Sequence, residues 1–214
     1  MSAHPHANQT VLTLGPPPAE ARLAAILIHG RGASAEDILG LAQGLAVPDV
    51  AYLAPQAAGH TWYPYSFLSP IAQNEPDLSS ALLVIEGLVR SLEQQGVPAD
   101  RVVLMGFSQG ACLTLEFTAR HARRYAAIAA FSGGLIGPAG TARDYPGSFA
   151  GTPVFVGCSD VDPHIPVERV RESAEVCRRM GASVDERIYP RMGHTINQDE
   201  IEAVSRLLAP AANG

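Results

Sequence analysis

The sequence predicts an α/β protein with a mostly parallel central sheet and helices on both of its faces. Short apolar runs of strand length alternate along the chain with segments of helical periodicity. One such run, Val102 to Met105, passes through a Gly-rich turn directly into a helical pattern. A chain of 214 residues has the length of one domain, so we expect a single domain over residues 1–214, with residues 1–10 as a flexible N-terminus.

Composition excludes several kinds of partner. The 15 basic and 21 acidic residues give a net charge of −6, and the basic residues are scattered, which argues against binding to nucleic acid. The longest apolar runs, such as Leu23 to Ile28, are too short to span a bilayer, so we expect no stable membrane insertion. The three cysteines form no C-x-x-C motif, which favours free thiols and a cytoplasmic location.

The first half of the chain contains three predicted strands. Val11 to Leu14 reads as an edge strand because a run of prolines follows it. Leu23 to Ile28 is continuously apolar, as expected for a strand covered on both faces. Ser34 and Asp37 predict a capping box that opens a helix, and Val50 to Ala54 predicts the third strand.

The second half continues the alternation after a long irregular segment. Residues 56–76 lack periodicity but are rich in aromatic side chains, which predicts a loop that either packs on the core or lines a substrate groove. The elements expected after it are a helix from Asp77 towards Gly96, a strand at Val102–Met105 with a helix after the turn, strands at Ala126–Phe131 and Pro153–Val156, a helix at Val167–Met180, a strand at Val184–Tyr189, and a helix at Asn197–Leu208.

The turn after Met105 is the most informative local signal. Gly106-Phe-Ser-Gln-Gly110 links a buried strand to a helix, and its two glycines remove the Cβ atoms that would clash in so tight a turn. This context predicts a nucleophile elbow, which raises the Ser108 hydroxyl above the sheet at the N-terminus of a helix.

Other loops that follow predicted strands carry the groups that a serine nucleophile needs. Asp160 and Asp162 follow one strand, and His194 follows the last one. Ligands bind at the carboxyl ends of the strands in such sheets, so these side chains should meet there. An imidazole can take the serine proton, and a buried carboxylate can orient the imidazole. The chain order Ser, Asp, His fits this arrangement.

Seven short motifs occur in order over most of the chain: His29-Gly-Arg-Gly32, the aromatic segment around Trp62, Gly96-Val-Pro98, Gly106-Phe-Ser-Gln-Gly110, Phe131-Ser-Gly-Gly134, Asp162-Pro-His-Ile-Pro166 and Gly193-His194. The ordered set resembles the phospholipase/carboxylesterase family of α/β-hydrolases, which includes acyl-protein thioesterases. The resemblance implies an α/β-hydrolase fold. No insertion between strand and helix is long enough for a large cap domain.

The resemblance implies a role for five residues. Ser108 matches the nucleophile, His194 the general base and Asp162 the orienting acid, with Asp160 as the alternative on the same loop. The oxyanion hole would be formed by the backbone N–H groups of Gln109 and Arg31. Thioesterase members typically have Leu at the position of Arg31, and this departure bears on acyl specificity.

The predicted function is hydrolysis of carboxylic esters with small to medium acyl chains through an acyl-enzyme intermediate. Alternatives are a thioesterase acting on acyl-proteins or acyl thioesters, a lysophospholipase, and a catalytically silent hydrolase fold that binds a ligand. Candidates for an apolar substrate wall are Trp62, Leu135, Ile136 and Ile165. We expect a small-molecule ester as partner, a monomer or homodimer, no cofactor and no metal; His4, His6 and His121 are assigned to solvent.

Overall fold

A seven-stranded sheet forms the centre of the computed structural model, which describes residues 4–209. The strand order is β1-β3-β2-β4-β5-β6-β7, and all neighbours are parallel except β1, which pairs antiparallel with β3 at one edge. The strands are β1 (Val11–Leu14), β2 (Leu23–Ile28), β3 (Val50–Pro55), β4 (Val102–Phe107), β5 (Ala127–Phe131), β6 (Pro153–Ser159) and β7 (Ser183–Tyr189). The expectation of a mostly parallel sheet is confirmed.

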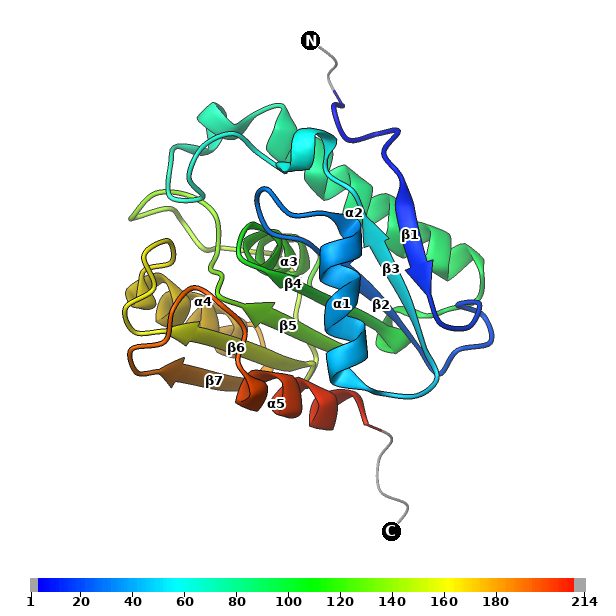
Figure 1. Cartoon of the computed structure of the whole chain (residues 1–214). Coiled ribbons are helices and arrows are strands. Elements are labelled where there is room, and N and C mark those ends of the chain that lie inside the picture. Colours follow the sequence, from blue (N-terminus) through cyan, green and yellow to red (C-terminus); the bar gives the residue numbers. More distant parts are fainter. Residues whose placement is uncertain (1–3, 210–214) are drawn as a thin grey trace.

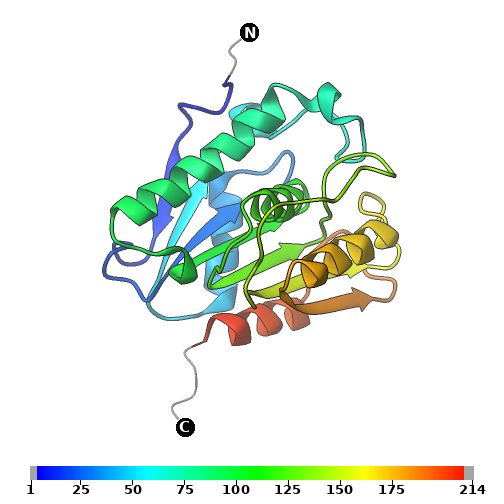
Figure 2. The ribbon, with the colours of Figure 1, turned by 180° about the vertical axis from the view of Figure 1, so that it is seen from behind.

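Helices cover both faces of the sheet, as expected. They are α1 (Ala35–Leu45), α2 (Asp77–Gln94), α3 (Gln109–Arg120), α4 (Val167–Arg179) and α5 (Gln198–Leu208). Helices α1 and α5 lie together on the face seen in Figure 1, and α2, α3 and α4 cover the opposite face seen in Figure 2. Each layer of helices buries its apolar side against the sheet, which gives one hydrophobic cluster on either face.

Strands β4 and β6 extend at least two residues beyond their predicted ends, and both extensions lead to the candidate site. Strand β4 continues through Gly106 and Phe107, which pair with β5. Strand β6 continues from Gly157 to Ser159, which pairs with Tyr189 of β7. Pairing with neighbours maintains these strands where the apolar run has already ended. As a result, residues 108 and 160–162 directly follow the carboxyl ends of strands.

The N-terminal segment requires a correction. Most of residues 4–10 are exposed, and the flexibility expected of residues 1–10 stays a prediction, but His6, which we expected to face solvent, is buried. Its backbone N–H donates to Ser80 Oγ, and its ring bonds to Trp62 O and Ala58 N, each at 3.0 Å. Residues 1–3 of that segment lie outside the described part of the chain. Polar partners from distant segments bury this histidine, and no local pattern signals them.

Two further properties concern the cysteines and the helices. The thiols of Cys112, Cys158 and Cys177 are all buried and free. Among residues 4–209, no helix combines the length and the apolar character needed to cross a membrane.

Candidate active site

Ser108 occupies a sharp turn between β4 and α3. Its backbone has φ 54° and ψ −117°, a conformation that residues other than glycine rarely adopt. The turn is held by two hydrogen bonds: Ser108 N–H donates to Phe131 O at 2.9 Å, and Cys112 N–H donates to Ser108 O at 3.0 Å. Neighbouring structure therefore maintains the strained residue in place, as predicted for a nucleophile elbow.

The two glycines of the elbow permit a close approach of strand and helix. A Cβ atom on Gly110 would lie 2.0 Å from the carbonyl oxygen of Ile28 in β2, and one on Gly106 would lie 2.5 Å from the Gly110 carbonyl. No side chain fits at such distances. These contacts explain why the motif has glycine at both positions.

The three side chains that the sequence singled out for catalysis are in contact. His194 Nε2 lies 2.8 Å from Ser108 Oγ, and His194 Nδ1 lies 2.7 Å from Asp162 Oδ2. A carboxylate only accepts hydrogen bonds, so Nδ1 carries the proton and Nε2 is the acceptor for the serine hydroxyl. The ring of Phe107 lies against the imidazole, with centroids 4.9 Å apart.

Asp162 is held as a buried carboxylate. Its other oxygen, Oδ1, accepts the backbone N–H groups of His164 at 2.8 Å and Ile165 at 3.0 Å. Burial opposes its ionisation, but the bonds from His194 and from these two amides outweigh burial, so the pKa of Asp162 lies below its ordinary value. It is therefore the charged form that faces the imidazole.

Asp160 lies on the same loop but points elsewhere. Its Oδ1 accepts the backbone N–H of Arg191 at 2.7 Å, and its side chain is exposed. The structure thus brings Asp162, and not the alternative Asp160, to His194.

The glycine-rich loop after β2 lies beside the elbow. His29, at its start, is buried: its Nδ1–H donates to Gly30 O at 2.8 Å, and its Nε2 accepts Ala57 N–H at 3.0 Å. Burial lowers the pKa of His29, which favours the neutral ring that these bonds require. Its role is therefore to orient the loop that carries Arg31.

The side chains of Arg31 and Gln109 fasten the aromatic segment to the elbow. The Gln109 amide accepts Trp62 N–H at 2.8 Å and donates to Tyr63 O at 2.9 Å. The Arg31 guanidinium donates to the carbonyl oxygens of Tyr63, Pro64 and Tyr65 at 2.8–2.9 Å. The sequence linked the identity of residue 31 with acyl specificity, but it did not predict that the side chains of Arg31 and Gln109 hold this segment.

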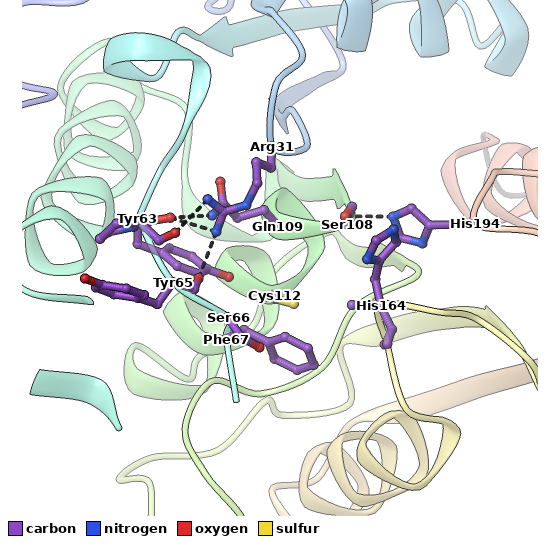
Figure 3. A pocket seen from close by; sticks show the side chains of 12 residues that line it. Arg31, Tyr63, Tyr65, Ser66, Phe67, Ser108, Gln109, Cys112, His164 and His194 are labelled. Carbon is purple, nitrogen blue, oxygen red and sulfur yellow. Dashed lines mark hydrogen bonds between the residues drawn. The ribbon is translucent and has the colours of Figure 1, made fainter. Parts of the chain in front are cut away.

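A pocket of about 390 Å³ opens beside Ser108. Figure 3 shows Ser108 and His194 on one side of it and Arg31 with the aromatic segment on the other. The residues that line it are Arg31, Tyr63, Pro64, Tyr65, Ser66, Phe67, Ser108, Gln109, Cys112, His164, Ile165 and His194. Aromatic and aliphatic side chains, among them Tyr63, Phe67 and Ile165, share this wall with polar ones.

Three of the four residues expected to form the apolar wall do not reach this pocket. Ile165 does line it, but Trp62, Leu135 and Ile136 are fully buried and are not among the lining residues. The indole N–H of Trp62 donates to His29 O at 2.9 Å, which turns the ring into the core. The neighbouring residues Tyr63 and Phe67 form the wall instead.

Leu135 and Ile136 are held inward by a buried polar network. Glu116 of α3 accepts Ile136 N–H at 3.0 Å, Arg143 donates to Ile136 O at 2.6 Å, and Arg169 donates to Leu135 O at 2.8 Å. These backbone contacts come from residues far apart in the chain. The apolar character of the two residues is therefore explained by the core.

Comparison with known proteins places the chain in a family. A family profile described as phospholipase/carboxylesterase matches residues 13–211. A crystal structure of a phospholipase/carboxylesterase from Dyadobacter fermentans is 45% identical, with a TM-score of 0.92 and coverage of 97% of this chain and 98% of that one. The fold is the α/β-hydrolase fold, with no large cap domain inserted within residues 4–209. The chain belongs to the phospholipase/carboxylesterase family.

More distant relatives include acyl-protein thioesterases. The acyl-protein thioesterase 1 of Neurospora crassa is 28% identical over 138 residues, and that of Gibberella zeae is 31% identical over 131 residues. The matches cover 64% and 59% of this chain but 56% of each relative, so they span little more than half the length of these proteins. The structure of esterase PE8, at 23% identity and a TM-score of 0.75, shares the fold.

Proposed function

We propose that this protein is a serine hydrolase that cleaves carboxylic esters of small to medium acyl chain length. One observation carries the proposal: Ser108 Oγ, the His194 ring and the Asp162 carboxylate form a continuous hydrogen-bonded chain with links of 2.8 and 2.7 Å at the edge of a pocket. A strained nucleophile, a base and an orienting acid in this order can perform acyl transfer.

In the first step, Ser108 Oγ attacks the ester carbonyl while His194 Nε2 takes its proton. Asp162 stabilises the imidazolium that forms, because its carboxylate accepts the Nδ1–H bond. The backbone N–H groups of Gln109 and Arg31 would stabilise the oxyanion. Gln109 is the first residue of α3, where a backbone N–H has no acceptor within the helix.

In the second step, the alcohol leaves with the proton from His194, and water attacks the acyl-enzyme. His194 now takes a proton from that water and returns it to Ser108 as the acyl-enzyme breaks down. The products are a carboxylic acid and an alcohol. No group beyond these residues and water is required for the atoms to balance.

The pocket supports a modest acyl chain. Its volume of about 390 Å³ falls near the lower end of the range for small-molecule sites. Phe67, Cys112 and Ile165 offer apolar surface for a short aliphatic chain.

We further expect the protein to work in the cytoplasm, since its three cysteines carry free thiols, and to be a monomer or homodimer.

Thioester hydrolysis is the second candidate function. The observation that favours it is the similarity to two proteins named acyl-protein thioesterase 1. The same machinery would attack a thioester carbonyl and release a thiol. A silent binding protein is disfavoured by the short bonds that join all three candidate catalytic side chains.

The test is a series of nitrophenyl esters with acyl chains from two to sixteen carbons, together with a matched thioester series. We expect the highest kcat/KM at the short to medium chains. Ser108→Ala should lower kcat by about four orders of magnitude or more, because the three residues act as a unit. Labelling by a fluorophosphonate should occur on the wild type and disappear in this variant.

Other outcomes would change the assignment. Comparable turnover of long-chain esters and thioesters would favour the thioesterase. A Ser108→Ala variant that keeps most of its ester turnover would contradict the proposed nucleophile. Absence of both turnover and labelling in the wild type would support the silent fold.

A further inference from the structure

The side chain of Arg31 lies at the pocket in a fixed orientation. Its Nη1 donates to Pro64 O at 2.9 Å, and its Nη2 donates to Tyr63 O at 2.9 Å and to Tyr65 O at 2.8 Å (Figure 3). The guanidinium carbon also lies 6.0 Å from the centre of the Tyr63 ring. A side chain held by three backbone oxygens loses little further freedom when it binds a ligand.

The charge of this side chain is not neutralised by the protein. Within residues 4–209, Arg31 takes part in no ion pair, whereas Arg143, Arg169 and Arg187 each contact a carboxylate. No Asp or Glu is among the residues that line the pocket. A protein with a net charge of −6 therefore presents a cation without a counter-ion beside its reactive serine.

Part of the guanidinium remains available to a ligand. Arginine has five N–H bonds, of which three are donated to the carbonyl oxygens of the aromatic segment. The Nε–H and one Nη1–H have no acceptor among the described residues, and the side chain is exposed at the pocket. These two N–H groups lie on different sides of the guanidinium, so a ligand carboxylate can accept one charge-assisted hydrogen bond from either of them.

Holding the aromatic segment in place does not by itself explain why residue 31 is charged. The oxygens that Arg31 contacts are neutral carbonyls, and the neutral amide of Gln109 already bonds to Tyr63 O and to Trp62 N–H of the same segment. A positive charge strengthens binding most when the bound group is an anion. The backbone N–H of Arg31 is also one donor of the proposed oxyanion hole. The side chain of the same residue lines the pocket together with Ser108.

We propose that Arg31 makes this enzyme selective for esters that carry a carboxylate close to the scissile carbonyl. The inference rests on the proposed ester hydrolysis and names its substrate class. The carboxylate accepts a free N–H of the guanidinium while Ser108 attacks the ester. Monoesters of short dicarboxylic acids carry it on the acyl side, and esters of hydroxy acids carry it on the alcohol side.

The test compares each carboxylate-bearing ester with a neutral ester of the same length. On the acyl side, mono-nitrophenyl esters of succinic to adipic acid are paired with nitrophenyl esters of the corresponding unbranched acids. On the alcohol side, carboxyphenyl butanoate is paired with phenyl butanoate. The rate found with Ser108→Ala is subtracted as background. The readout is the ratio of kcat/KM within each pair, so that a general loss of activity cancels.

We expect the wild type to prefer the anionic ester in at least one series by about tenfold or more, the factor that a hydrogen bond to a charged group provides. Arg31→Gln should abolish this preference, and Arg31→Lys should keep part of it. The preference should weaken as salt is added, because the site is open to solvent. Arg90→Gln removes an equal charge from an exposed position on α2 and should leave the ratio unchanged.

Two results would overturn the inference. One is a wild type that does not discriminate between charged and neutral esters in either series. The other is an Arg31→Gln variant that loses activity on both members of a pair equally. That result would mean that Arg31 only holds the aromatic segment in place. Either result leaves ester hydrolysis itself intact. Failure of the proposed function is recognised separately, by ester turnover that persists in Ser108→Ala.

Discussion

At the scale of single residues, the two aspartates after β6 have different surroundings. Asp162 is buried, bonds to His194 Nδ1 and accepts two backbone amides, whereas Asp160 is exposed and bonds to Arg191 N–H. They differ by two positions in the sequence, and both are carboxylates. Only the direction in which the loop presents them separates their roles.

This difference gives a matched pair of variants. Asp162→Asn should lower kcat by about a thousandfold or more, because a neutral amide neither stabilises the imidazolium nor fixes the tautomer of His194. Asp160→Asn should leave kcat within about threefold, since the amide oxygen can still accept the same N–H. Steady-state kinetics of both variants on one nitrophenyl ester measures this difference. Equal losses in the two variants would contradict the assignment of Asp162.

At the scale of elements, the junction of β4 and α3 depends on close backbone contact. Gly110→Ala would place a methyl group 2.0 Å from Ile28 O, so β2 and α3 would have to separate. We expect a loss of about 3 kcal/mol in the free energy of unfolding, together with loss of esterase activity as Ser108 shifts. Urea denaturation measures the first effect and ester turnover the second.

Gly87 provides the control for this prediction. It lies in the exposed middle of α2, and a Cβ there would have no neighbour within 4 Å. Gly87→Ala should therefore raise the free energy of unfolding by about 1 kcal/mol through helix propensity alone. If the two variants changed stability equally, the elbow would not be as tightly packed as the contacts indicate.

At the scale of the whole molecule, two buried histidines link the N-terminal segment to the pocket. Consecutive amides bond to them: Ala57 N–H donates to His29 Nε2 and Ala58 N–H donates to His6 Nδ1, both at 3.0 Å. Both rings contact Trp62, whose chain continues into the aromatic wall of the pocket. The cluster thereby connects the first described residues with the candidate active site.

Because of this histidine cluster, we expect the folded protein to lose stability in acid. Burial lowers the pKa of both His6 and His29 below the ordinary value of 6.5, so the unfolded chain binds protons more readily than the folded one. Their contribution to stability is present above pH 6.5 and is lost as the pH falls towards their folded pKa values. Protonation also removes the acceptor nitrogens that bond to the Ala57 and Ala58 amides.

The measurement is the free energy of unfolding between pH 5 and pH 8. His6→Gln should cost about 1–2 kcal/mol at pH 8 through lost hydrogen bonds, but its stability should fall less steeply below pH 6.5 than that of the wild type. Identical pH slopes for the two proteins would rule out His6 as a source of acid sensitivity.

Local patterns in the sequence were sufficient for the elements and the elbow. Apolar runs, glycine spacing and the Ser34 capping box act between residues that are neighbours in the chain, so the strands, the helices and the turn at Ser108 could be predicted. The order of motifs also predicted which polar loops would meet, because parallel strands bring their carboxyl ends to one edge of the sheet.

Only the tertiary structure decided the direction of side chains in the loops. Trp62, Leu135 and Ile136 turn into the core, Asp162 turns towards His194, and Arg31 turns over the pocket. Loops have no periodicity that assigns a face to each residue, and hydrogen bonds to distant backbone groups orient these side chains. The meeting of the loops that carry Ser108, His194 and the two aspartates was therefore predictable from the sequence, whereas the directions of the loop side chains and the walls of the pocket were not.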